Sequence, residues 1–203
     1  MGISERKERE KTEMRDLIRA AALKMFLEDG YAKTSIRRIA DAIEYSPGTI
    51  YLYYKDKDEL LYEVQGLAYG KLFEAFKTEA NSPDPLKKLH QLGKSYIKFG
   101  LNNPELYDLM FIIRSPTNVD EKIHKDNGND CMDYLVDCLS ECINQNLLRF
   151  TDLQMATLQI WSTVHGLLSL NLRCRLKILI APEDEVSAIL FKTVENYIAT
   201  VTN

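Results

Sequence analysis

Residues 46–57, SPGTIYLYYKDK, combine hydroxyl, aromatic and basic side chains in a pattern suited to a binding surface. Ser46 followed by Pro47 predicts a helix start, because serine caps helix N-termini and proline is tolerated in the first turn. Ile50 and Tyr54 lie four residues apart and can share an inward face. The other positions then face outward in varying degree: Gly48, Thr49, Tyr51, Leu52 and Tyr53. An exposed, aromatic-rich face on so short a helix indicates a partner.

The outward side chains suit contact with a phosphate backbone. A threonine or tyrosine hydroxyl donates to phosphate oxygen, a lysine such as Lys57 supplies a compact cation, and a helix N-terminus adds amides and a partial positive charge. Contacts of this kind position a protein on DNA without reading its sequence. The alternative is structural, with aromatic residues in the core and basic residues on a solvated face: Tyr51, Tyr53, Tyr54, Arg37, Arg38 and Lys57. We favour the binding surface.

Two earlier helices must position this segment. The first has apolar residues at helical spacing from Met14 to Phe26 and ends at Asp29-Gly30, where glycine permits a left-handed cap. The second runs from about Ser35 to Ile43, with Thr34 or Ser35 as its cap. Only two or three residues connect it to Ser46, so the two short helices form a candidate helix-turn-helix. The second helix of such a motif enters the major groove of DNA.

Across roughly residues 12–62 the chain resembles the DNA-binding signature of the TetR family of regulators, most clearly in TSIRRIADAIEYSPGTIYLYYKDKDELL. The resemblance implies that these residues face the operator: Pro47, Gly48, Thr49, Tyr51, Leu52 and Tyr53. It also implies that Lys57 meets a phosphate from the N-terminus of the following helix. The two predicted caps, Ser35 and Ser46, complete the expected DNA-binding set together with Arg37, which lies at another position that the family uses.

Arg37 is the expected reader of a guanine, because its planar guanidinium can bond O6 and N7 together. Leu52 can offer only apolar contact, for example to a thymine methyl. The mixed tail before residue 12, with basic Arg6 to Lys11 among three glutamates, either touches the DNA backbone or extends the first helix. We favour the extension.

The whole chain of 203 residues is predicted to be all-α, with about nine helices, because helical spacing recurs throughout and strand signals are scarce. Asp56 is expected to cap a long fourth helix that ends near Ala80, and more helices are expected near 85–100, 104–113, 129–148, 152–172 and 183–201. The expected domains are a three-helix DNA-binding domain, 1–62, and a larger helical domain for effector binding and dimerisation, 63–203.

Composition excludes several other classes. No apolar run approaches the roughly 20 residues of a membrane-spanning helix, and the first residues lack an apolar secretion signal, so we expect a cytoplasmic protein without membrane contact. The net charge of −4 argues against a protein coated in nucleic acid, but a local basic surface suffices for an operator. We expect no cofactor, metal or catalytic residue. An all-helical enzyme and a helical interaction module are the rival hypotheses.

NNPELYDLMF and WSTVHGLLSL resemble the C-terminal domain named for its Trp-His-Gly motif, here Trp161, His165 and Gly166. Trp161 and His165 lie one helical turn apart, and Gly166 would let another backbone come close. If a cavity exists, its expected wall suits an apolar or aromatic effector: Tyr96, Phe99, Tyr107, Met110, Phe111, Trp161 and His165. The alternative is an ordinary core, which we favour for His165.

Cys131, Cys138 and Cys142 share one helix face, which fits either a redox or metal sensor or, as we favour, plain core residues. The last two helices carry more apolar surface than one protomer needs, so a homodimer is expected to form through them. Two recognition helices would then meet half-sites about 34–36 Å apart, or a multiple of that, on a palindromic operator. The resulting hypothesis is a repressor that binds double-stranded operator DNA. An effector then releases the repressor from the DNA by moving the fourth helix.

Overall fold

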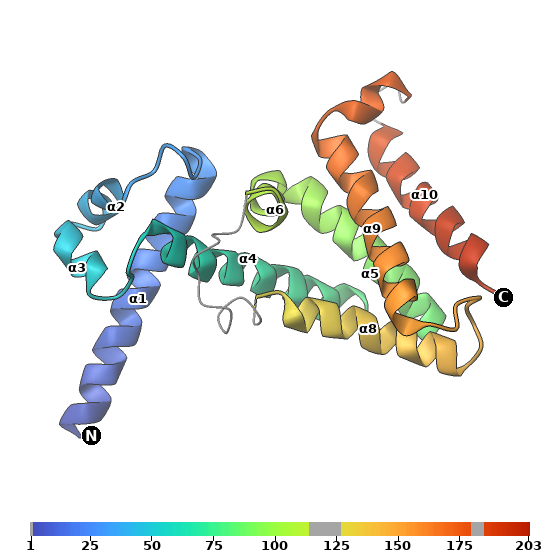
Figure 1. The fold of residues 1–203 in the computed structure, drawn as a ribbon, viewed down its shortest axis with the longest axis horizontal. Helices are drawn as coiled ribbons and strands as arrows, with labels where there is room; N and C mark the ends of the chain where they lie inside the picture. Colours follow the sequence, from blue (N-terminus) through green and yellow to red (C-terminus); the bar gives the residue numbers. More distant parts are fainter. Residues whose placement is uncertain (1, 114–126, 180–184) are drawn as a thin grey trace. The chain divides into compact units, whose positions relative to one another are not determined.

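The computed structural model describes residues 2–113, 127–179 and 185–203, and every regular element in these ranges is a helix (Figure 1). The helices are α1 (Ile3–Glu28), α2 (Ile36–Ala42), α3 (Pro47–Tyr51), α4 (Lys57–Glu79), α5 (Pro85–Asn102), α6 (Pro104–Phe111), α8 (Asn129–Asn144), α9 (Leu153–Leu172), the 3-10 helix η1 (Arg175–Ile178) and α10 (Val186–Val201). The predicted all-α class is confirmed. None of the described helices is long and apolar enough to cross a lipid bilayer.

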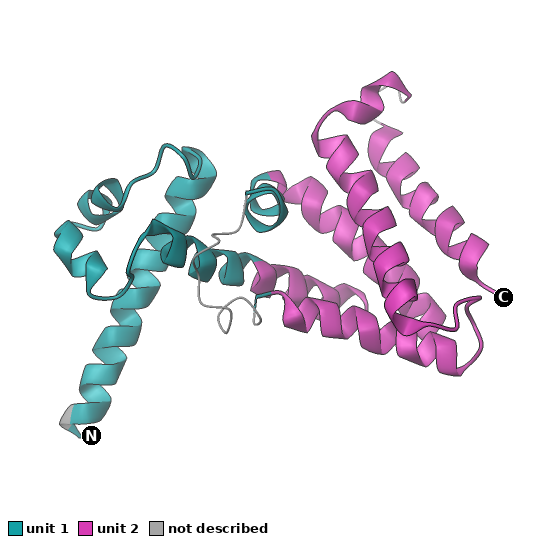
Figure 2. Ribbon diagram, viewed as in Figure 1, with its two compact units in different colours: residues 1–68, 105–127 teal, residues 69–104, 128–203 magenta. Residues whose placement is uncertain are grey.

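The chain forms two compact units (Figure 2). Unit 1 consists of residues 1–68 and 105–127, and unit 2 of residues 69–104 and 128–203. Packing of Leu109 on α6 with the N-terminal helices was not predicted. The functional division after residue 62 stays a prediction, because these units are defined by packing alone.

Unit 1 has one buried apolar core to which α1, α2, α3, α4 and α6 all contribute. Its members are Ile18, Ala22, Phe26, Ile36, Ile39, Ala40, Ile50, Tyr54, Leu60, Leu61, Val64 and Leu109. Leu109 comes from α6, where its carbonyl accepts a hydrogen bond of 2.8 Å from Gln65 Nε2 on α4. This bond satisfies a buried amide, and it holds α6 against the N-terminal helices.

Helix α1 begins at Ile3, so the basic and acidic tail extends the first helix, as favoured above. Exposed ion pairs at four-residue spacing line this extension, with Arg6 Nε 2.8 Å from Glu10 and Arg9 Nε 3.5 Å from Glu13. Each such pair adds only a few tenths of a kcal/mol. Gly30 has a φ of 85°, which confirms the predicted left-handed turn after α1.

Several predicted boundaries shift in the structure. The helix predicted to end at residue 148 ends at Asn144, because Asn146 adopts a left-handed φ of 54°. The helix predicted to end at residue 113 ends at Phe111. Helix η1, which Cys174 precedes with a φ of 56°, had no sequence signal.

In unit 2, α5 packs against α9 and α10 (Figure 1). It comes closest to them at two glycines of its own. A methyl group at Gly93 would lie 2.7 Å from Val194 Cγ1, and one at Gly100 would overlap the side chain of Leu168. Gly166, predicted to allow a close approach, has no described atom within 4 Å of such a methyl group. That prediction was therefore wrong within one protomer, and the close approaches are made by α5.

Gly100→Ala should lower the free energy of unfolding by about 1–3 kcal/mol, because the added methyl group meets packed side chain and not solvent. The matched control is Gly70→Ala on α4, where a methyl group meets no described atom within 4 Å. That change should raise stability by up to about 1 kcal/mol, since alanine favours helix. Denaturant titration of both variants measures the difference. Equal effects would contradict the close contact at Gly100.

Candidate nucleic-acid interface

Helices α2 and α3 are short, and side-chain caps define their starts. Ser35 Oγ accepts a hydrogen bond of 3.3 Å from Arg38 N, and Ser46 Oγ accepts one of 3.2 Å from Thr49 N. Both predicted caps are present. Between the helices, Glu44 adopts a φ of 61°, and Tyr45 N donates to Ala40 O at 3.0 Å. This left-handed residue was not predicted, because glutamate rarely adopts that conformation.

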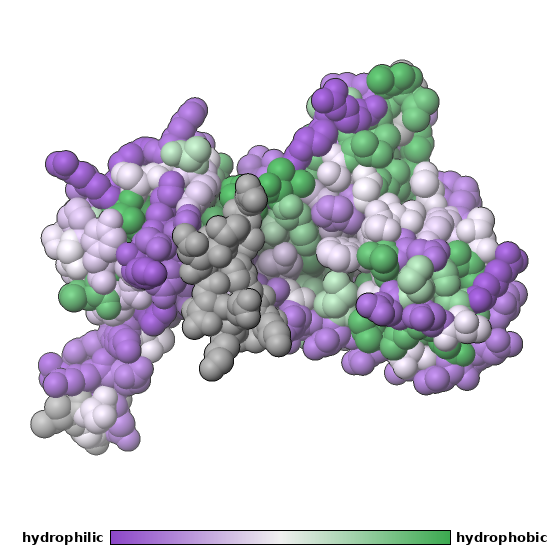
Figure 3. All heavy atoms as spheres, viewed as in Figure 1, coloured by the Kyte–Doolittle hydropathy of each residue, from purple (hydrophilic) through white to green (hydrophobic). Residues whose placement is uncertain are grey.

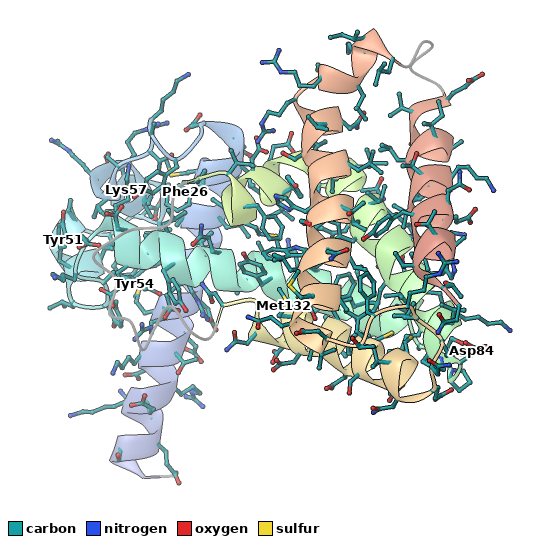
Figure 4. The ribbon with its side chains drawn as sticks, turned by 45° about the vertical axis from the view of Figure 1, so that its right-hand side comes forward. Phe26, Tyr51, Tyr54, Lys57, Asp84 and Met132 are labelled. Atoms are coloured by element: carbon teal, nitrogen blue, oxygen red, sulfur yellow. The ribbon has the colours of Figure 1, made fainter. Side chains whose placement is uncertain are left out.

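The inner and outer sides of α3 differ sharply. Ile50 and Tyr54 are buried, as predicted, at 0% and 1% exposed. Tyr51 and Leu52 are 55% and 81% exposed, whereas Thr49 and Tyr53 are half-buried. Figure 4 shows Tyr51 at the outer side of unit 1 and Tyr54 nearer to α1 and α4. The alternative that these tyrosines are core residues therefore holds for Tyr54 and is wrong for Tyr51.

The two arginines of α2 have different surroundings. Arg38 Nη2 lies 2.6 Å from Asp29 Oδ2, and Arg38 Nη1 donates to Lys33 O at 3.1 Å. Arg37 is exposed and makes no hydrogen bond or ion pair with any residue that the structure describes. Arg38 thus holds the loop after α1, while the guanidinium of Arg37 is available to another molecule.

Lys57 has a structural role that the sequence did not reveal. Its ammonium donates to Tyr31 O at 2.9 Å and to Thr34 O at 3.0 Å, and it lies 3.9 Å from the centroid of the Tyr31 ring. An ammonium has three N–H donors, so these carbonyls take two of them. Lys57 ties the loop before α2 to the start of α4, and only its remaining donor can reach a phosphate.

The start of α4 is held by two further sets of contacts. Asp56 Oδ1 accepts a hydrogen bond of 2.8 Å from Glu59 N, and Glu59 Oε2 accepts one of 2.6 Å from Lys55 N. The first of these bonds confirms the predicted role of Asp56 as the cap of α4. The Tyr31 hydroxyl donates to Asp58. The pKa of Tyr31 is raised above its usual range, mainly by burial and next by this hydrogen bond.

A charged cluster joins α1 to α4 beside α3. The Glu63 carboxylate lies 3.4 Å from Arg15 Nη2 and 3.2 Å from Arg19 Nη1. The Arg15 guanidinium lies 5.1 Å from the centroid of the Tyr54 ring. Burial, followed by the charge of Glu63, raises the pKa of Tyr54. The inner side of α3 is thus fixed by residues of both long helices.

The exposed apolar residues of unit 1 are few, and the visible face of the unit is mostly hydrophilic (Figure 3). Three of them belong to the turn and helix that follow α2: Tyr45, Tyr51 and Leu52. Exposed large apolar residues that fall within so short a stretch of chain indicate a contact surface.

Two short capped helices joined by a tight turn, the second with an exposed outer side, define a helix-turn-helix DNA-binding protein. The family model for bacterial regulatory proteins of the tetR family matches residues 18–64, and the model for the Tetracyclin repressor-like C-terminal domain matches residues 89–194. The chain therefore belongs to the tetR family of bacterial regulatory proteins. The resemblance to the Trp-His-Gly subgroup is not tested by these matches and stays a prediction.

Individual relatives agree with this assignment. The uncharacterized HTH-type transcriptional regulator YuxN of Bacillus subtilis is 38% identical over 80 residues, which cover 38% of this chain and 26% of YuxN. A solved protein of unknown function from Rhodococcus sp. RHA1 has a TM-score of 0.77 at 19% identity, covering 93% of this chain and 95% of that one. A tetR family regulatory protein from Rhodococcus RHA1 has a TM-score of 0.66 at 22% identity, covering 92% and 96%. The structural matches establish the fold.

The residues of the predicted effector pocket fall in both units. In unit 2 the Tyr96 hydroxyl lies 2.8 Å from His165 Nδ1, and the Trp161 and His165 rings are 5.9 Å apart between centroids. Phe99 is buried in the same unit. Burial lowers the pKa of His165, which favours its neutral form. In unit 1 the pocket residues are Tyr107, Met110 and Phe111, with the rings of Tyr107 and Phe111 5.1 Å apart between centroids. The cavity itself stays a prediction.

The three cysteines of α8 are buried in unit 2. Cys138 Sγ lies 3.4 Å from Pro85 O, and Cys131 Sγ lies 3.5 Å from Tyr69 O. Burial raises the pKa of Cys131 to about 12, so its thiolate is disfavoured. No group of three His, Cys, Asp or Glu residues within the described ranges has a geometry that could hold a metal ion. The burial of all three cysteines fits the core alternative favoured from the sequence.

Proposed function

We propose that the chain is a ligand-responsive repressor that binds a palindromic operator as a homodimer and is released by a small-molecule effector. The observation that carries the proposal is the outer side of α3, a helix of five residues, where the last helical residue Tyr51 and the C-cap Leu52 are 55% and 81% exposed. A helix so short is held by its buried side, here Ile50 and Tyr54, and its other side is left for a partner. Because the chain belongs to the tetR family of regulatory proteins, we take this partner to be DNA.

In this proposal α3 lies in the major groove and α2 beside it. The hydroxyls of Tyr51 and Tyr53 donate to phosphate oxygens. The hydroxyls of Ser46 and Thr49 hydrogen-bond to each other at 3.0 Å, so one of these two donates to the other and the second donates to a phosphate. Leu52 offers apolar contact to a thymine methyl, and Arg37 bonds O6 and N7 of a guanine. Pro47 and Gly48 let the backbone approach the DNA, while Ser35 keeps α2 and therefore Arg37 in place. Lys57 uses its remaining donor for a phosphate.

Dimerisation is proposed through α9, together with α10. On α9 the exposed apolar residues are Met155, Leu158 and Leu170, at 47%, 54% and 48% exposed. With Ser162 and Gly166 between them at three- and four-residue spacing, they form one stripe along the helix. Small residues in the middle of an apolar stripe suit close packing against the same stripe of a second protomer, as a twofold axis requires. On α10, three apolar residues are already buried within unit 2 and are not available to a second protomer: Leu190, Val194 and Ile198.

Leu158→Lys should convert the dimer to a monomer or raise its dissociation constant at least tenfold. The change places a charge on the proposed interface, and a buried charge without a partner is costly. Analytical ultracentrifugation over a dilution series measures the result. Leu17→Lys, at a position 43% exposed on α1 in unit 1, is the control and should leave the assembly unchanged. A monomeric parent protein, or a Leu158→Lys dimer of parental affinity, would refute the α9 interface.

Release by an effector is proposed to act through α4. Three residues in the first two turns of this helix hold the DNA-binding part: Lys57 and Asp58 bind the loop after α1, and Glu63 binds Arg15 and Arg19. A shift of α4 would disturb all of these contacts together. A coupling of about 1–3 kcal/mol is typical between effector and operator sites. The aromatic residues around His165 favour an apolar or aromatic effector.

A mobility shift assay with the DNA upstream of the chain's own gene tests the proposal. Because bound phosphates release counterions, affinity should fall roughly a thousandfold between about 50 and 200 mM salt. An interaction module would show no such binding, and neither would a helical enzyme. Specific binding that competitor DNA of random sequence does not displace supports a regulator, and absence of binding at low salt rejects it.

A further inference from the structure

Unit 2 has a solvent-open cleft of about 310 Å³ where α5 meets α10 and the end of α4. Its lining residues are Glu79 from α4, Phe191 from α10, and Gln91, Lys94, Ser95 and Lys98 from α5. Lys94 and Ser95 each lie three or four residues from both Gln91 and Lys98, so the four α5 residues share one face of the helix. The volume lies at the lower end of the range typical of small-molecule sites. None of these residues belongs to the aromatic pocket predicted from the sequence.

Two ion pairs border the cleft. Lys98 Nζ lies 2.5 Å from Glu79 Oε1, and Lys94 Nζ lies 2.6 Å from Glu195 Oε1 on α10. All four side chains keep 34–54% of their surface exposed, so the pairs themselves hold the helices together only weakly. Each ammonium has three N–H donors. Both lysines can therefore donate to a bound anion without losing their partners.

Ser95 provides an independent sign of a ligand. It lines the cleft with only 2% of its surface exposed, and its hydroxyl has no hydrogen-bond partner among the described residues. A buried hydroxyl without a partner is unfavourable, because it has lost its hydrogen bonds to water and has formed none within the protein. Gln91 is held beside it, since its Oε1 accepts a hydrogen bond of 3.1 Å from Ser82 N, which turns the amide nitrogen to other partners.

We propose that this cleft binds a small organic carboxylate with an apolar body. The carboxylate lies between Lys94 and Lys98, Ser95 and Gln91 add hydrogen bonds, and the body packs on Phe191. Phe191 disfavours inorganic phosphate, because a fully polar ion leaves the ring without contact. Glu79 also repels a dianion more strongly than a singly charged carboxylate. Carboxylate binding to this cleft does not depend on the proposed function as a repressor. Only a link between an occupied cleft and release of the operator rests on that function.

Three probes separate the contributions of charge and apolar body: 3-phenylpropionate, its neutral analogue 3-phenylpropanamide, and propionate, which lacks the ring. Each is titrated into the full chain by calorimetry or by amide NMR. We expect 3-phenylpropionate to bind at least tenfold more tightly than either of the others, because charge-assisted hydrogen bonds and buried apolar area both contribute. Equal affinity for acid and amide, or no binding at millimolar concentration, overturns the proposal.

Variants locate the binding. The double change Lys94→Gln with Lys98→Gln should weaken 3-phenylpropionate at least tenfold, and Ser95→Ala should weaken it severalfold while the melting temperature stays the same or rises. Lys87→Gln, exposed on the same helix outside the cleft, is the matched control and should bind as the parent does. Parental affinity in the double variant overturns the site. A mobility shift assay without probe judges operator binding separately, so DNA binding without probe binding rejects only the cleft.

Discussion

Arg37→Ala is expected to weaken operator binding at least thirtyfold. One bidentate contact between an arginine and a guanine contributes about 1–3 kcal/mol of discrimination, and a dimer loses two such contacts, or about 2–6 kcal/mol. The fold should not change, because Arg37 is exposed and makes no hydrogen bond or ion pair with any described residue. Mobility shift titrations with the operator, and with operators changed at one base pair per half-site, measure both affinity and specificity.

The control for Arg37 is Lys71→Ala, an exposed basic residue of α4 that lies in unit 2. It should bind as the parent does, which excludes a general effect of lost charge. If Arg37 reads a guanine, the variant also tolerates a change at that base pair. Uniform loss on all sequences, with a smaller dependence on salt, would assign Arg37 to the phosphate backbone instead. Unchanged affinity would remove α2 from the interface.

Tyr54→Ala is expected to lower the free energy of unfolding by about 3–5 kcal/mol, the range for loss of a buried aromatic side chain. Tyr54 is 1% exposed and belongs to the core on which α3 rests. Because α3 spans only Pro47–Tyr51, it has little stability of its own and depends on this core. Operator binding should therefore be lost together with the near-ultraviolet signal of the folded domain. Chemical denaturation and circular dichroism measure the two effects.

Tyr54→Phe separates the ring from the hydroxyl. The Tyr54 hydroxyl is buried and has no hydrogen-bond partner in the described part of the chain, so its removal leaves no group unpaired. The ring remains available to the core and to the guanidinium of Arg15. Stability and operator affinity should equal or exceed those of the parent. A loss above about 1 kcal/mol would show that the hydroxyl has a partner in solution.

Local sequence determined the all-helical class and the starts of α2, α3 and α4. The serine and aspartate caps, Ser35, Ser46 and Asp56, act on amides three residues away, so their effect can be predicted from neighbours alone. The same holds for the burial of Ile50 and Tyr54, which follows from four-residue spacing on one helix. The exposed residues between them, and therefore the candidate interface, were predictable for that reason.

Only the tertiary structure decided which distant residues meet. The bonds of Lys57 to the carbonyls of Tyr31 and Thr34, and the packing of Leu109 with the N-terminal core, join segments 23 to 44 residues apart. The close contact of Gly100 with Leu168 joins residues that lie farther apart still in the sequence. The periodicity of a helix shows which of its faces is apolar, but many other apolar surfaces of similar size could pack against that face. The choice among them depends on the packing of all helices at once, which no single segment encodes.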